Sequence, residues 1–591
     1  MHQPQLTTHQ ASYFEYQTFP FVRPPELDGR DGHHPVVIIG AGPIGLILAI
    51  LLARHGVKSV LIEAEAQVSS GSRALALARR TMEIIEQCGV ADAILEGALL
   101  WKDGYSFYKG RVVHHLDIPF SDDDKFAPMT NLAQCIIEKI LVERANALGV
   151  EIRFQTKLTA LDAQDDGVAL TLDTPEGPYR LRADWLLACD GARSTVRRLQ
   201  GLRFEGRSYE SRFVICDFNI AIDSPAGRRC YFDPPWLPGQ SVLMHQAPHD
   251  VWRLDYQVPE HVSDEQALDR DRLRQNIQAH LAYIGVDAPW TFEWVTLYKP
   301  NALTLADYRH GRVLYCGDAA HLLPVFGVRG MNTGVQDSIN LAWKLAAVVA
   351  GQASEALLDT YSSERVADAR QICVEAGRST QMMAPPSRGF KIMQQAVLSL
   401  ALDQPWVRGL LHWRTSHPID YADSPLTWPD AEAREFTQGP RPGAPPRNAQ
   451  LIPGRTDGGF LLDMTGAAFT VLAFSCDQPQ WQGLVSDAAS LRARGIAVRL
   501  LRIRRAPDDG ADAGATTKIE TVIDDASGHL HRLWGAEHDQ GGGTVYVLRP
   551  DQHVLARWKP AGKERLGAAI EHALAPHRRP VDPPAHARSH A

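Results

Sequence analysis

Three glycines near the start of the chain have the spacing needed to bind the phosphates of a dinucleotide. They lie in Gly40-Ala41-Gly42-Pro43-Ile44-Gly45, directly after the apolar run 36–39. In such a turn the first glycine leaves the strand sharply, the second lets the backbone approach a pyrophosphate, and the third lets the next helix pack on the strand. The helix expected over 43–55, which Gly56 ends, points its N-terminal amides at the phosphates.

An acidic residue follows this turn at the distance expected for a ribose contact. The strand expected over 59–62 ends at Glu63, eighteen residues after Gly45. A carboxylate there binds ribose hydroxyls and favours an unphosphorylated ribose, as in FAD or NAD. The rival interpretation is a membrane span, because residues 36–53 carry no charge and approach the lower length limit for one. The placement of the glycines after a strand favours the nucleotide fold.

Two further polar motifs each follow an expected strand. Cys189-Asp190-Gly191-Ala192-Arg193-Ser194 comes after the run 184–188, and Gly317-Asp318-Ala319-Ala320-His321 comes after the run 312–316. A helix is predicted over 330–349, because its apolar residues recur at helical spacing and Gly351 follows it. The plain alternative for Asp190 and for Asp318 is a carboxylate that caps a short helix.

Composition excludes several other classes of protein. The 591 residues should form two or more domains, and 45% hydrophobic and 22% charged residues are ordinary for a globular protein. A net charge of −8 argues against a general nucleic-acid surface. The eight cysteines contain no CxxC pair, so we predict no metal site and no dithiol redox centre. No signal-peptide pattern is present, and we expect a cytoplasmic protein without a membrane partner.

The three motifs, taken in order, resemble those of the class A flavoprotein aromatic hydroxylases. This is the group of para-hydroxybenzoate hydroxylase and phenol hydroxylase, and the likeness is strongest to the longer, 3-(3-hydroxyphenyl)propionate hydroxylase-like members. The most specific piece runs from Gly317 through Gly330-Met331-Asn332-Thr333-Gly334 and Asp337 to Asn340-Leu341-Ala342-Trp343-Lys344-Leu345. The resemblance covers residues 34–385 well and the rest loosely.

The resemblance implies FAD as the cofactor and assigns cofactor-binding roles to fifteen residues. The pyrophosphate would be held at the glycine turn, the adenosine ribose by Glu63, the ribityl chain by Asp318, and the flavin ring by Pro324 and the first amides of the 330–349 helix, whose positive end favours an anionic reduced flavin. The full set is Gly40, Gly42, Pro43, Ile44, Gly45, Glu63, Arg73, Gln134, Asp190, Gly191, Asp318, Pro324, Gly330, Met331 and Asn332.

Several alternatives stay open at these positions. Arg73 could instead be a solvated arginine and Gln134 a surface residue. His321 could be structural or chemical. Arg329, where many relatives have a neutral residue, could bind an acidic substrate group or face solvent.

The expected architecture is α/β with an α+β insertion. It comprises an N-terminal arm (1–33), a discontinuous Rossmann-like FAD-binding domain (34–205 and 300–385), an antiparallel substrate-binding sheet (206–299), a helical segment and linker (386–446), a thioredoxin-like domain without CxxC (447–575) and a disordered tail (576–591). The arm should pack on the body or on a partner subunit. The C-terminal domain is expected to serve subunit contact, which leaves a homodimer open.

The implied reaction is the hydroxylation of a phenolic substrate. In the family NADPH or NADH reduces FAD, and reduced FAD adds O₂ to give a C4a-hydroperoxide whose distal oxygen attacks an electron-rich ring. Polar residues of the expected sheet that could act on the phenol proton are Tyr209, Tyr231, His245 and Tyr256, but none is distinguished, so the catalytic residues stay unknown. The alternatives are an oxidase or dehydrogenase of the same fold, a halogenase, whose WxWxIP signature is missing, or a non-catalytic FAD-binding protein.

Overall fold

The computed structural model describes residues 11–30, 32–411, 416–454, 459–505, 520–537, 542–561 and 565–575. The expected tail, 576–591, lies outside these residues. The chain forms two compact units: unit 1 contains residues 1–339 and 366–417, and unit 2 contains residues 340–365 and 418–591. Two long helices, α8 (Gly330–Val349) and α9 (Leu357–Met383), each contribute residues to both units.

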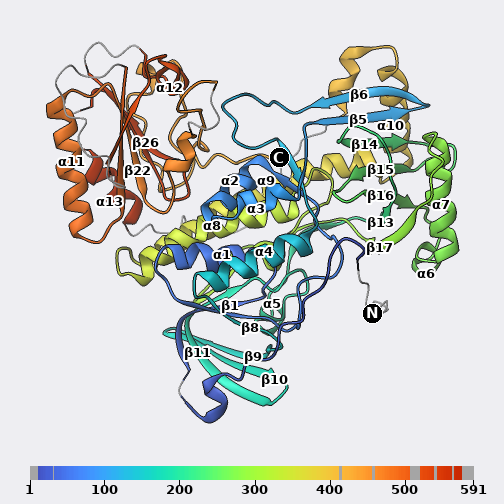
Figure 1. Ribbon diagram of the computed structural model, residues 1–591, viewed down its shortest axis with the longest axis horizontal. Helices are drawn as coiled ribbons and strands as arrows, with labels where there is room; N and C mark the ends of the chain where they lie inside the picture. The colour runs from blue at the N-terminus through green and yellow to red at the C-terminus, as the bar shows by residue number, and fades with distance from the viewer. Residues whose placement is uncertain are drawn as a thin grey trace, which may run out of the picture. The chain divides into compact units, whose positions relative to one another are not determined.

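The first sheet of unit 1 is the expected nucleotide-binding sheet, with strand order β19-β20-β11-β1-β2-β8. Pairing is parallel from β20 through β11, β1 and β2 to β8. Figure 1 shows α1 (Pro43–Arg54) and α4 (Gln134–Ala147) side by side over this sheet. The strands are β1 (His33–Ile39), β2 (Ser59–Ile62), β8 (Glu151–Arg153), β11 (Gly177–Ala188), β19 (Arg309–His310) and β20 (Val313–Tyr315), with β9 (Lys157–Gln164) and β10 (Gly167–Thr174) attached to β11.

The second sheet of unit 1 has seven strands in the order β17-β13-β16-β15-β14-β5-β6. They are β5 (Asp103–Tyr108), β6 (Arg111–Asp117), β13 (Arg212–Asn219), β14 (Arg228–Phe232), β15 (Ser241–Gln246), β16 (Val251–Val258) and β17 (Thr291–Tyr298). The expected sheet spanned only 206–299. The structure adds the hairpin β5–β6, because β5 pairs with β14 in parallel across a long stretch of sequence.

Side-chain alternation gives this second sheet two different faces. One face packs on α7 (Arg270–Tyr283) through residues such as Val214, Leu254 and Ile277. Part of the other face packs on α10 (Arg388–Ala401) and the end of α9 through Phe213, Leu243 and Leu398. The rest of that face carries polar side chains, which belong to the candidate site.

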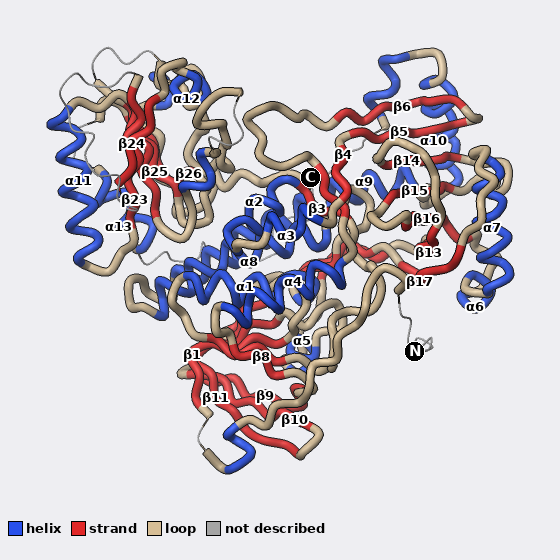
Figure 2. Tube along the Cα trace, viewed as in Figure 1, coloured by secondary structure: helices blue, strands red, loops and turns tan. Residues whose placement is uncertain are grey.

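Short elements connect these parts. Figure 2 shows the strands of unit 1 in red, the helices in blue and the connecting loops in tan. The remaining elements of unit 1 include α2 (Arg79–Cys88), α3 (Ala91–Glu96), α5 (Thr195–Leu199), α6 (Asp264–Ala267) and the small sheets β3-β7-β4 (Ala76–Ala78, Met129–Asn131, Leu99–Trp101) and β12-β18-β21 (Glu205–Ser208, Asn301–Thr304, His321–Leu322).

The described part of the N-terminal arm packs on unit 1. The Ser12 backbone N–H donates to Glu293 over 3.0 Å, and Phe19 stacks on Phe154 with ring centroids 4.2 Å apart. Glu26, on the short helix Pro25–Asp28, makes a buried ion pair with Arg153 over 3.1 Å. These contacts show how the arm is held on the same chain.

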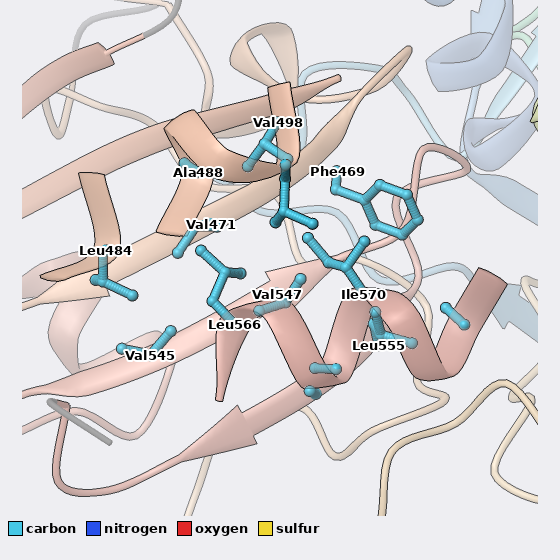
Figure 3. Packing of buried hydrophobic residues seen from close by; sticks show 14 of the residues in the cluster. Phe469, Val471, Leu484, Ala488, Val498, Val545, Val547, Leu555, Leu566 and Ile570 are labelled. Carbon is cyan, nitrogen blue, oxygen red and sulfur yellow. The ribbon is translucent and has the colours of Figure 1, made fainter. Parts of the chain in front are cut away.

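Unit 2 is built around a five-stranded sheet in the order β24-β23-β22-β25-β26. The strands are β22 (Phe469–Phe474), β23 (Val498–Arg504), β24 (Glu520–Asp524), β25 (Thr544–Leu548) and β26 (Val554–Trp558), and the helices are α11 (Gln478–Ala493), α12 (His529–Leu533) and α13 (Leu566–Leu574). Its core gathers Val471 and Val547 of the sheet, Leu484 of α11 and Ile570 of α13, which Figure 3 shows close together.

The expected linker differs from what the structure shows. Residues 418–446 belong to unit 2, and the Gly/Pro-rich stretch packs closely on it. A Cβ at Gly439 would lie 2.4 Å from the Trp534 carbonyl oxygen, and Gly443 donates its N–H to Val554 over 2.7 Å. Glycine there permits close packing of the backbone rather than freedom of a linker.

Candidate active site

All three motifs meet at one edge of the first sheet. Ile39 pairs with Ala188 and with Ile62, and Ala188 pairs with Tyr315. Because these strands are parallel, their carboxyl ends lie side by side, and the glycine turn, Glu63, Asp190 and Asp318 follow those ends. Open α/β sheets bind ligands at this edge.

The glycine turn has room for a phosphate and needs its glycines. Gly40 has a φ of +104°, and a Cβ there would lie 2.5 Å from the Cys189 carbonyl oxygen. A Cβ at Gly45 would lie 2.0 Å from the Gly40 carbonyl oxygen. At Gly42, in contrast, an added Cβ would meet nothing within 4 Å, and no side chain caps α1. An open, uncapped helix N-terminus fits a pyrophosphate.

Glu63 closes the same turn. Its carboxylate accepts hydrogen bonds from the backbone N–H of Ala41 over 2.7 Å and of Glu65 over 2.9 Å. Burial raises the pKa of Glu63 although these bonds act in the opposite direction. Two bonds leave a carboxylate with acceptor capacity for a ribose hydroxyl.

Asp190 caps a short helix, which is the alternative role that the sequence suggested for it. Its Oδ2 accepts from the backbone N–H of Thr195 over 2.6 Å and of Val196 over 3.1 Å, at the start of α5. Its Oδ1 is buried and has no hydrogen-bond partner among the described residues. Arg197 ties this loop to the third motif, because it donates to the carbonyls of Ala192 (2.6 Å) and Ala319 (3.1 Å).

Asp318 has the environment of a ligand-binding carboxylate. It is the middle residue of a short 3₁₀ helix (Gly317–Ala319) whose N-cap is Cys316, so Asp318 is not a helix cap. Asp318 is exposed to solvent, yet the neighbouring protein desolvates its carboxyl and raises its pKa, and the positive charge of Arg73 acts in the opposite direction. No hydrogen bond to its side chain occurs in the described part of the chain. The group is therefore available to a ligand.

His321 is held as a structural residue. It is completely buried, and its Nε2 lies 2.8 Å from Asp337 Oδ2, which also accepts the Gly317 N–H over 2.9 Å. Asp337 thus fixes both ends of the Asp318 loop. Close helix packing supports this arrangement, because a Cβ at Gly334 would lie 2.8 Å from Ile44.

Arg73 is exposed and lies on a strained loop. Its φ is +39°, a left-handed conformation that side chains rarely adopt and that often marks functional sites. The Gln134 side chain accepts the Ala74 N–H over 3.2 Å. It therefore stabilises the Arg73 loop and is not an isolated surface residue. Arg253 donates to the Arg73 carbonyl over 2.7 Å and also bonds Ser72.

The start of α8 lies beside this loop. Asn332 is buried, and its amide bonds Ala76 and Ala78 of β3 over 3.0 and 2.7 Å. The Asn332 side chain is thus committed to the protein, so Asn332 can offer a cofactor only its backbone groups. Pro324 is buried on the preceding loop.

Arg329 does not face solvent. The side chain is 1% exposed and pairs with Glu375 over 3.2 Å, and the pKa of Glu375 is lowered in spite of burial. The solvent interpretation of Arg329 is therefore wrong. Burial of a charge in a protein requires such a partner.

Sequence reasoning missed a polar row across the second sheet. Cross-strand pairing places Asp217, Arg253, His245 and Arg228 side by side on four adjacent strands. Arg253 and Asp217 form a buried ion pair over 2.8 Å. Only strand register, which pairs residues far apart in sequence, could have revealed this row.

The residues that could act on a phenol proton lie on different faces of this sheet. His245 lies in it, and burial together with the neighbouring arginines lowers its pKa well below the usual value. Tyr231 and Tyr256 lie on the opposite face, in the core under α7, where burial raises the pKa of Tyr231 to about 12. Asp255, on the polar face, has a pKa raised to about 7 by burial. The tyrosines of the α7 face are thus poor candidates.

Two protein-family models and a curated relative match this chain. The FAD binding domain family model matches residues 33–376, and the HcaD C-terminal domain model matches residues 455–573. A 3-(3-hydroxy-phenyl)propionate/3-hydroxycinnamic acid hydroxylase of Shigella sonnei (strain Ss046) is 28% identical over 554 residues, covering 90% of this chain and 94% of the relative.

Solved structures share the fold. The flavin-dependent monooxygenase PieE, in complex with FAD and substrate, has a TM-score of 0.76 at 24% identity, and aklavinone-11 hydroxylase, in a ternary complex with FAD and aklavinone, has a TM-score of 0.69 at 25% identity. Each alignment covers 92% of this chain and 99% of the other.

The chain belongs to the FAD binding domain family. The recognition of a class A flavoprotein aromatic hydroxylase is confirmed, and the protein is an FAD-dependent enzyme of that class. The mixed α/β fold is confirmed as well. None of the described helices has the length and apolar character needed to cross a bilayer.

Proposed function

We propose that the protein consumes NADPH or NADH and O₂ to hydroxylate a phenolic substrate. The observation that carries the proposal is that an open glycine turn and an available Asp318 carboxylate meet at one sheet edge, with Arg73 on a strained loop close enough to Asp318 to affect its pKa. Named relatives that act on hydroxyphenyl acids support the phenolic class. Bound FAD supplies electron transfer from the nicotinamide and activation of O₂.

The residues of the chain fit FAD and would hold it as follows. The amides of α1 bind the pyrophosphate, Glu63 a ribose hydroxyl, and Asp318 hydroxyls of the ribityl chain. The N-terminal turn of α8 offers backbone N–H groups and a positive dipole end, which stabilise negative charge on a bound ring. Arg73, supported by Gln134 and Arg253, adds a fixed positive charge near Asp318.

The substrate would lie against the polar row of the second sheet. Arg253 belongs to this row and donates a hydrogen bond to the Arg73 carbonyl, which connects the sheet directly to the Arg73 loop. The lowered pKa keeps His245 neutral at pH 7, so its imidazole can accept a hydrogen bond from a phenol hydroxyl, although it is a weak base for full proton transfer.

We further infer a thioredoxin-like arrangement for unit 2. The order β23-β22-β25-β26, with β22 and β23 parallel and β25 and β26 antiparallel, supports it. The role in subunit contact remains part of this proposal, and sedimentation of the purified protein tests it.

The test is oxidation of NADPH and of NADH by the FAD-loaded protein, with and without a panel of phenols and hydroxyphenyl acids. Substrate-stimulated oxidation with a product one oxygen heavier supports the proposal. Stimulated oxidation that yields only hydrogen peroxide identifies an effector and not the substrate. Failure of both nicotinamides to reduce the bound flavin refutes the monooxygenase proposal and favours an oxidase, while a protein unable to bind FAD would be non-catalytic.

A further inference from the structure

Three polar side chains of unit 2 form a connected row far from the flavin residues in sequence. Ser475 Oγ lies 2.9 Å from His531 Nε2, and His531 Nδ1 lies 2.7 Å from Asp525 Oδ2. The same Asp525 oxygen accepts the backbone N–H of His531 over 2.9 Å. A carboxylate on Nδ1 fixes the proton there and leaves Nε2 free to accept the serine proton, which is the connectivity of a Ser-His-Asp triad.

The serine occupies an exposed and strained turn. Ser475 directly follows β22 and comes three residues before the start of α11, and its φ is +49°. A left-handed serine between a strand and a helix is how α/β-hydrolases expose their nucleophile. His531 is completely buried and Asp525 is 3% exposed, whereas Ser475 is exposed. If Ser475 served only as a hydrogen-bond partner of the buried His531 imidazole, it would need neither a left-handed backbone nor exposure to solvent.

The sheet brings the three residues together at one edge. β22, β23 and β24 are parallel, so their carboxyl ends lie side by side. Ser475 follows β22, Asp525 follows β24, and His531 lies on α12 a few residues later. The chain order serine, aspartate, histidine is that of the α/β-hydrolases, although the surrounding sequence Ala473-Phe474-Ser475-Cys476-Asp477 lacks their glycines.

The charges around the row suit acyl transfer. Burial tends to raise the pKa of Asp525, but hydrogen bonds from His531 outweigh it, and the pKa is lowered overall. Asp525 is therefore ionised at neutral pH and can stabilise an imidazolium. Arg502 donates to the Cys476 carbonyl over 3.0 Å, which places a positive charge beside the serine turn.

We propose that Ser475, His531 and Asp525 form a second catalytic site, which hydrolyses carboxylic esters. Ser475 Oγ bonds to the acyl carbon while its proton passes to His531 Nε2. The bond from the acyl carbon to the alcohol oxygen breaks, and the alcohol leaves with that proton. Water then attacks the acyl-serine and gives a proton to His531, which returns it to Ser475 as the acid leaves. The sum is ester plus water to acid plus alcohol, without any redox step.

The test uses the full FAD-loaded chain with p-nitrophenyl acetate and a fluorophosphonate probe. We expect hydrolysis with a pH profile that follows one histidine, and a label on the peptide that contains Ser475. Ser475→Ala should abolish both, and His531→Gln and Asp525→Asn should each slow them by about a hundredfold or more. The matched control is Ser490→Ala, which changes an exposed serine on α11.

Two readouts keep the outcome decisive. FAD content and nicotinamide oxidation should be unchanged in every variant, because the flavin residues lie in the other unit. If Ser475→Ala does not fold, Ser475→Cys retains a nucleophile, and its alkylation should fall when His531→Gln is added. Absence of label at Ser475 in excess probe, or hydrolysis that Ser475→Ala leaves unchanged, would overturn the proposal.

Discussion

At the scale of single residues, Gly42 and Gly45 have different tasks in the same turn. We predict that Gly42→Ala keeps the stability of the cofactor-free protein within about 0.5 kcal/mol, since its φ of −71° suits alanine and no atom lies near the added Cβ. The methyl group would enter the phosphate space and weaken FAD binding by about tenfold or more. Gly45→Ala should lower both stability and FAD binding, because its Cβ meets the Gly40 carbonyl. Thermal unfolding and flavin titration separate the two, and an unchanged FAD affinity in Gly42→Ala would contradict the assignment.

Asp255 predicts a pH dependence of stability. Burial raises its folded-state pKa to about 7, above the usual value of 3.8. The folded state therefore favours the protonated form, and the stability that this gives is complete below pH 3.8 and lost as the pH rises to 7. Asp255→Asn should accordingly gain stability over the wild type between pH 4 and pH 8, by about 4 kcal/mol at most.

Urea unfolding at several pH values measures this difference. Asp173→Asn, a change at an exposed position of β10, is the matched control and should show no trend. A difference between Asp255→Asn and wild type that stays constant from pH 4 to pH 8 would mean that Asp255 titrates normally.

At the scale of elements, Arg549 joins the end of β25 to the helices of unit 2. It bonds both Glu364 on α9, over 2.7 Å, and Asp551, and all three side chains are at most 2% exposed. Lys344 on α8 also pairs with Glu364, over 2.6 Å, and burial lowers the pKa of Lys344 to about 8. The network holds two helices on the sheet edge.

We predict that Arg549→Met destabilises unit 2 by about 3–5 kcal/mol, because it leaves two buried carboxylates without their main partner. Denaturant unfolding, followed by hydrogen exchange in β25, measures the loss. Arg441→Met removes an exposed arginine paired with Asp420 and should cost less than about 1 kcal/mol. An equal loss of unfolding free energy in the two variants would show that burying the Arg549 network does not increase its contribution to stability.

At the scale of the whole molecule, the flavin residues lie in only one of the two units. We predict that FAD at a hundred times its Kd stabilises unit 1 by about 2.7 kcal/mol, since only the folded state binds it. Hydrogen exchange should slow in β1, β11 and β20 and stay unchanged in β22–β26. Equal protection of β22–β26 would instead show that the two units unfold together.

Much of the cofactor site was predictable because it rests on local features. The glycine turn, β2 and α8 follow the sequence closely: β2 is Ser59–Ile62 and α8 is Gly330–Val349, as expected. Turn chemistry and helical periodicity act over a few residues. Each of the three motifs directly follows its strand in the sequence, so its place at a strand end needs no long-range contact. The assignment of individual residues to FAD remains a proposal.

Other features depended on contacts that sequence spacing does not encode. The hairpin β5–β6 joins the second sheet through β14, more than a hundred residues later. The side chains of Asn332 and Gln134 hydrogen-bond to backbone groups of the protein. Arg329 forms a buried ion pair with Glu375. Buried polar groups need partners, and folding supplies those partners from anywhere in the chain.

The sequence by itself determined the class of this protein, because a phosphate-binding turn and its helix are local structures with a distinctive composition. The tertiary structure alone decided which polar side chains meet. Strand register built the Asp217–Arg253–His245–Arg228 row, and parallel pairing of β22, β23 and β24 brought Ser475 to His531 and Asp525. Register and parallel pairing are set by packing of whole sheets, which no short stretch of sequence specifies.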